Sequence, residues 1–148
     1  MVPHHELGVR LIDIAAMQAD DVRLRELAFE MSGYHVSELV LLRRWRATWS
    51  LSPGSPRSPD AAHRDHGADG ALGMLDESEI ADLTARLGTD FDRRWLQLMI
   101  RHHEGGVAMA DDELAAGRSH PARQLAAQIA AVQRQQIRAM QSLLTLLG

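Results

Sequence analysis

Apolar residues recur every three or four positions along most of this chain, which is the spacing of an α-helix with one buried face. The pattern predicts four long helices, over residues 3–19, 22–49, 90–116 and 121–147, and a shorter helix over residues 77–87. Glycine follows two of these segments, at Gly88 and Gly117, and Pro121 stands where a helix tolerates proline best. The sequence therefore predicts an all-α protein.

The first and the last part of the chain share a motif. Shifting the sequence by 98 residues places His4, His5 and Gly8 on His102, His103 and Gly106, and further identities follow without a gap. A repeat of this length indicates a helical hairpin used twice, and two hairpins form a four-helix bundle. We expect one helical domain over residues 1–148, with hairpin one at 1–50, a linker and the short helix at 51–88, and hairpin two at 89–148.

The linker differs in composition from the rest of the chain. Residues 50–75 are rich in Ser, Pro, Gly, Asp and His, which is typical of a surface loop. His63, His66 and Met74 in this segment suggest a metal-capturing arm, although solvated loop histidines are the simpler interpretation.

Composition excludes several function classes. The chain has 148 residues and a net charge of −4, which argues against nucleic acid as a partner. It has no apolar run near the roughly 20 residues that cross a bilayer, so we expect no membrane insertion. Cysteine is absent, so soft-metal chemistry would depend on the seven Met and eight His.

The repeated motif carries the candidate chemistry. On a helix, Met99, His102, His103 and Met109 share the face that points into the bundle, with the two histidines on either side of its midline. Thioether and imidazole together suit a soft or borderline ion, with copper the leading candidate and another transition metal as the alternative. In the bundle, His4 and His5 should approach the second pair from the opposite hairpin. The opposing interpretation is that the methionines pack and the histidines are only hydrogen-bonded.

The motif and its surroundings resemble the DUF305 family of ferritin-like four-helix proteins. The resemblance rests on these positions: Phe91, Met99, Ile100, His102, His103, Gly106, Met109, Gly117, Leu125, Ala126, Ile129, Gln133, Ile137 and Met140. It implies a ferritin-like bundle, export from the cytoplasm and, for some members, copper binding. The chain departs from the family pattern at His35 and Gln136 and lacks a helical lead-in before His4. We therefore expect a secreted or periplasmic protein whose export signal lies upstream of this fragment.

Three functions remain open on the sequence. The first is a non-enzymatic protein that sequesters or hands on copper, with a metal-delivery partner or a second copy of itself. The second is a di-iron oxidase-like enzyme, which is weakened because Gln133 and Gln136 stand opposite His35 and Glu38, and amides bind hard iron poorly. The third is a structural or partner-binding bundle in which the histidines satisfy one another.

Overall fold

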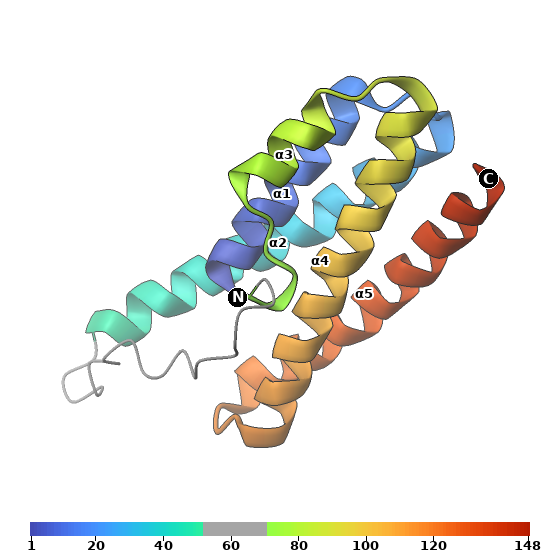
Figure 1. The fold of residues 1–148 in the computed structure, drawn as a ribbon. Helices are drawn as coiled ribbons and strands as arrows, with labels where there is room; N and C mark the ends of the chain where they lie inside the picture. The colour runs from blue at the N-terminus through green and yellow to red at the C-terminus, as the bar shows by residue number, and fades with distance from the viewer. Residues whose placement is uncertain (52–70) are drawn as a thin grey trace.

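The computed structural model describes residues 1–51 and 71–148, and within these ranges every regular element is helical (Figure 1). The elements are α1 (Val2–Gln18), α2 (Val22–Leu51), the 3₁₀ turn η1 (Ala71–Gly73), α3 (Glu77–Thr84), α4 (Gly88–Ala116) and α5 (His120–Leu146). The all-α prediction is confirmed, with helix bounds close to those expected from periodicity. The short helix ends at Thr84, earlier than the predicted residue 87. The predicted arm histidines, His63 and His66, lie outside the described residues.

Four long helices make up two antiparallel hairpins, α1 with α2 and α4 with α5, which pack together chiefly through α1 and α4 (Figure 1). A buried hydrogen bond joins them, since the indole Nε1–H of Trp95 on α4 donates to the carbonyl of Leu11 on α1 at 2.7 Å. The short helix α3 lies beside α1, where Arg10 forms a two-pronged ion pair with Glu77. The ferritin-like four-helix prediction is thus confirmed.

Local signals fix several helix ends. Asp76 and Glu79 form a capping box at the start of α3, each side chain accepting from the other's backbone N–H. The turn between α1 and α2 has a local cap, because the Asp21 carboxylate accepts from the backbone N–H of Arg23 at 2.8 Å, and a second contact comes from another helix. The buried carboxylate of Asp92 on α4 accepts from the backbone N–H groups of Asp20 and Asp21, at 3.0 and 2.8 Å. This contact positions hairpin one on hairpin two.

The core has an apolar cluster on either side of a polar layer. The larger cluster includes Trp95 and Met99 on α4 and Met140 on α5, and the smaller one includes Ala110 and Ile129. Apart from Asp92, the buried polar residues of the long helices fall between the two clusters: His4 and His5 on α1, His35 on α2, His102 and His103 on α4, and Gln133 and Gln136 on α5. The buried histidines therefore form a layer across the bundle.

Candidate metal centre

Five imidazole rings from three helices form a connected cluster. Each of the five histidines exposes at most 2% of its surface. His4 and His102 stack with ring centroids 3.7 Å apart and planes at 11°, so the two repeated motifs meet directly. His35 lies between the other members of each pair, with centroids 5.5 Å from His5 and 5.3 Å from His103. The structure thus brings together the four histidines predicted from the sequence and adds His35, which the sequence placed only as a neighbour.

The outer histidines, His5 and His103, are braced by polar side chains. The Nε2 atom of His5 lies 2.9 Å from Glu38 Oε2, and the Nε2 atom of His103 lies 2.8 Å from Gln136 Oε1. Both pairs are 33 residues apart, and a shift of 98 residues carries one pair onto the other. These matched contacts agree with the two-hairpin repeat, which stays an interpretation of the sequence.

The second nitrogen differs between the two braced rings. The Nδ1 atom of His5 lies 3.3 Å from the Met1 carbonyl, so acceptors flank both nitrogens of this ring. The Nδ1 atom of His103 has no hydrogen-bond partner. Because Gln136 Oε1 accepts from Nε2–H of His103, a neutral His103 ring keeps a free lone pair on Nδ1.

The inner histidines are held in a different way. His35 Nδ1–H donates to the Met31 carbonyl and His102 Nδ1–H to the Gly73 carbonyl, both at 3.1 Å. A carbonyl can only accept, so in a neutral ring these bonds place the proton on Nδ1 and leave a bare lone pair on Nε2. Neither Nε2 atom has a hydrogen-bond partner. His4 is held the other way round, with Nε2–H donating to the His102 carbonyl at 2.9 Å and Nδ1 left without a partner.

The free nitrogens of His35 and His102 converge beside Gly8. A Cβ atom added to Gly8 would lie 2.9 Å from His35 Nε2 and 3.0 Å from His102 Nε2. The nearest atom to this point is His35 Cδ2, at 2.6 Å, so the glycine is what lets both rings pack this closely against α1. At the corresponding Gly106, a Cβ would meet the Oε1 atom of Gln133 and lie 3.0 Å from His4 Cε1. There an amide takes the corresponding place, and its two polar atoms are buried without partners.

Burial keeps these rings neutral. Desolvation, followed by the neighbouring His4, lowers the pKa of His102 from 6.5 to about 2. Desolvation, followed by His5, lowers the pKa of His4 to about 3 and that of His35 to about 4. Desolvation, followed by His35, lowers the pKa of His103 to about 3. A neutral imidazole is the form that binds metals, so protons compete weakly for these nitrogens.

The turn η1 reaches the centre by lying directly on α4. Leu72 and Gly73 both have positive φ angles, 45° and 77°. A Cβ on Gly105 would lie only 1.8 Å from the Leu72 carbonyl oxygen, so this glycine is what lets the two backbones touch. The contact places the Gly73 carbonyl on His102. Periodicity alone did not predict it, because it depends on a segment 29 residues away.

The predicted methionine ligands lie at the edge of this arrangement. Met99 is fully buried in the larger apolar cluster, one turn before His102 on α4, and Met109 is partly buried further along the same helix. Met74, predicted as part of the linker arm, packs against the core. Among residues 1–51 and 71–148 no three His, Asp or Glu side chains are arranged to hold one ion. Four imidazole nitrogens of the cluster nevertheless lack a hydrogen-bond partner: Nε2 of His35 and His102, and Nδ1 of His4 and His103.

Comparisons with known proteins place the chain in a family. The sequence pattern of the family described as "Domain of unknown function (DUF305)" matches residues 1–144. No curated protein matches the chain. Across the part of the chain that is described, no helix is both long enough and apolar enough to cross a membrane.

Solved structures of DUF305 proteins share the fold. One, from Streptomyces coelicolor and provisionally described as secreted, has a TM-score of 0.85 at 27% identity, covering 100% of this chain and 89% of its own. A DUF305 fragment from Deinococcus radiodurans gives 0.79 at 30% identity, with coverages of 98% and 90%. CopM in its Cu(II)-bound form gives 0.77 at 23% identity, with coverages of 98% and 90%, and in its Cu(I)-bound form 0.73 at 21%, with 96% and 88%. At these identities the likeness to CopM shows the fold.

Proposed function

This chain belongs to the DUF305 family, and we propose that it binds a copper ion through its buried imidazole cluster, holding or handing on the ion without catalysing a reaction. One observation carries the proposal: the partnerless Nε2 atoms of His35 and His102 approach the same point beside Gly8, at 2.9 and 3.0 Å from where a Cβ of this residue would stand. Buried acceptors without a donor are costly, by roughly 1–3 kcal/mol each. A cation between them would satisfy both.

The donor set favours copper. Imidazole suits copper and zinc, whereas the harder ions Mg²⁺, Ca²⁺ and Mn²⁺ prefer oxygen. The three atoms nearest to a Cβ of Gly8 all belong to imidazole rings, and Cu(I) accepts two-coordinate ligation better than zinc, which is usually tetrahedral. The Cu(I)- and Cu(II)-bound forms of CopM support the proposal as copper complexes of a protein with this fold.

We assign different roles to the residues that the sequence predicts as metal ligands. His102 supplies a ligand together with His35, and His4 offers its free Nδ1 beside them. His5 and His103 brace the cluster through Glu38 and Gln136. Met99 and Met109 are proposed as thioether donors that join only after side-chain rotation, as a soft Cu(I) ion would favour.

We also make proposals about the domain organisation, the localisation and the partners of the protein. We propose that the whole chain forms one domain and works outside the cytoplasm, which the Streptomyces coelicolor relative, provisionally described as secreted, supports. A metal-delivery partner or a second copy would receive the ion. The di-iron alternative is not favoured, because Gln133 and Gln136 are amides where such a site needs carboxylates. A purely structural bundle remains the competing function.

Equilibrium competition for Cu(I) against a chromophoric chelator, without oxygen, tests the proposal. We expect the wild type to take up one ion per chain and His102→Gln to weaken binding by at least about 100-fold, since even changes in residues that only orient ligands cost 10–100-fold. His35→Gln should weaken binding in the same way, because it removes an imidazole ligand. Glutamine is the residue found at the corresponding position of the second hairpin, Gln133. His120→Ala, an exposed histidine on α5, is the control and should bind like the wild type. Equal uptake by all four proteins, with folding verified by circular dichroism, would favour the structural bundle.

A further inference from the structure

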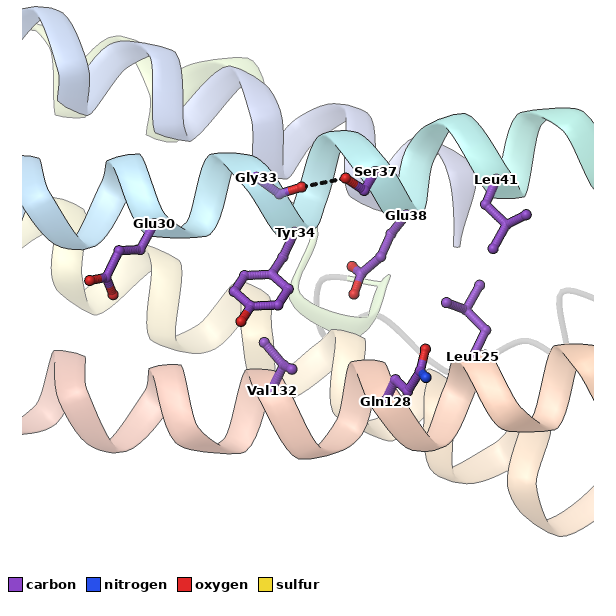
Figure 2. A pocket seen from close by; sticks show the side chains of 9 residues that line it. All are labelled: Glu30, Gly33, Tyr34, Ser37, Glu38, Leu41, Leu125, Gln128 and Val132. Atoms are coloured by element: carbon purple, nitrogen blue, oxygen red, sulfur yellow. Dashed lines mark hydrogen bonds between the residues drawn. The ribbon is translucent and has the colours of Figure 1, made fainter.

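A groove between α2 and α5 includes Glu38, a residue that contacts the histidine cluster. Its volume is about 530 Å³, and Tyr34 on α2 and Val132 on α5 face each other across it (Figure 2). Figure 2 also shows Glu38 directed from α2 into the space between the two helices. Glu38 lines this groove and also contacts His5 through its Oε2 atom. One carboxylate therefore belongs both to the groove and to the buried centre.

The groove has the charge expected of a route for cations. Its lining contains two carboxylates, Glu30 and Glu38, and no basic side chain among the described residues there. A concave surface with charge of one sign raises the local concentration of the opposite ion and can increase association rates by about 10–1,000-fold. The Glu38 side chain keeps 11% exposure, whereas His5 behind it keeps none. Glu38 thus lies at the boundary between solvent and the cluster.

The opposite side of the cluster lacks this feature. Gln136 occupies the position that corresponds to Glu38 and contacts His103, but it is neutral and does not line the groove. The two braces thus have similar hydrogen-bond geometry, 2.9 and 2.8 Å, and differ in charge and access. A purely structural brace needs no charge, as Gln136 illustrates, so the carboxylate on the groove side calls for a different explanation.

We propose that the groove between α2 and α5 is the route by which the metal cation reaches the buried imidazoles, with Glu38 as the residue that admits it. The inference rests on the proposed copper function and adds where the ion passes. Glu38 stabilises the cation as it loses water at the floor of the groove. From there the His5 ring leads inward to His35, whose ring centroid lies 5.5 Å away and whose Nε2 atom is one of the free nitrogens. Glu38 contacts His5 and is not one of the proposed ligands of the bound ion. It should therefore affect the rates of copper uptake and release more than the equilibrium affinity for copper.

Kinetics of copper release separate the route from the site. Protein loaded with one Cu(I) ion is mixed with excess chelator in the absence of oxygen, and copper transfer is followed by the absorbance of the chelator. The release rate is the limiting rate of transfer at chelator concentrations high enough that the rate no longer changes. The uptake rate follows from this rate and the equilibrium Kd. Glu38→Gln keeps an acceptor for His5 and removes the charge, so we expect both rates to fall about tenfold while Kd stays within about threefold. Gln128→Trp, which places an indole in the groove, should also slow both rates.

The matched control is Glu26→Gln, the same change at an exposed position of α2 outside the groove lining, and it should leave both rates unchanged. If Glu38→Gln behaves like this control, the route is wrong although the copper site stands. If Glu38→Gln instead changes Kd by changing only the release rate, with the uptake rate unaltered, Glu38 belongs to the binding site. That result also overturns the route. Failure of the wild type to bind copper at all would overturn the proposed function and the route together.

Discussion

Lowering the pH from 7 to 5 is expected to unfold this bundle in the absence of metal. Burial lowers the pKa values of His4, His35, His102 and His103 to between about 2 and about 4, whereas the same groups titrate near 6.5 when unfolded. Below pH 6.5 the unfolded chain therefore binds protons that the folded chain does not. Each such histidine lowers the free energy of unfolding by up to about 1.4 kcal/mol per pH unit.

The four histidines together should remove about 8 kcal/mol by pH 5, which is comparable with the whole stability of a domain, about 5–15 kcal/mol. Above pH 6.5 both states are neutral at these positions, so the effect disappears. Helical circular dichroism followed from pH 8 to 4 should show a steep transition. Replacing His35 by Gln should make the transition shallower, because one buried titrating group is lost. A chain that stays fully helical with unchanged stability at pH 4.5 would contradict the burial of neutral histidines.

Bound copper should move this transition to lower pH. A ligand that binds only the folded state stabilises it, and a coordinated nitrogen is no longer free to take a proton. The same titration repeated with one equivalent of Cu(I) therefore links the acid transition to the metal. An unshifted midpoint in protein shown to hold copper would place the ion away from the titrating histidines.

Replacing Gly105 by Ala is expected to destabilise the protein although alanine is the better helix former. The new Cβ would lie 1.8 Å from the Leu72 carbonyl oxygen and 2.1 Å from its carbon, and backbone atoms cannot move aside as a flexible side chain can. The turn η1 must then leave α4, which removes the Gly73 carbonyl from His102. We expect a loss of about 1–3 kcal/mol, as for other overpacked sites, together with weaker copper binding.

Gly33 on α2 provides the matched control. It is also inside a long helix, but a Cβ there meets nothing within 4 Å. Gly33→Ala should therefore stabilise the protein by about 0.5–1 kcal/mol, the usual gain over glycine in a helix, and leave copper affinity unchanged. Chemical denaturation of the two variants measures both effects. Equal stabilisation by both substitutions would show that η1 does not rest on Gly105.

Much of the architecture was predictable because helical periodicity is a local property. The repeat of apolar residues located all five helices, and the capping box at Asp76 located the start of α3. Angular position on a helix also indicated that His102 and His103 face inward, as they do. The pattern on α2 allowed either Tyr34 or His35 to be buried, and the structure decides for His35, with Tyr34 half exposed.

The chemistry within the cluster was not predictable to the same extent. Which imidazole nitrogen is free depends on which carbonyl the other nitrogen meets, and for His102 that carbonyl belongs to Gly73 in another segment. The α1–α2 turn is likewise held by Asp92, more than 70 residues along the chain, in addition to its local cap at Asp21. Only the fold identifies the close neighbour of Gly106 as Gln133. Side-chain roles of this kind depend on contacts between distant segments, which periodicity does not encode.

Anomalous X-ray scattering at the copper edge tests the central claim most directly. Crystals of the protein loaded with one equivalent of Cu(I) without oxygen would locate the ion without reference to any assumed ligand. We expect a single strong peak beside Gly8, about 2 Å from both His35 Nε2 and His102 Nε2, the usual length of a bond from imidazole to a metal of this kind. A peak bound elsewhere, or no peak at Gly8 in protein that holds copper in solution, would contradict it.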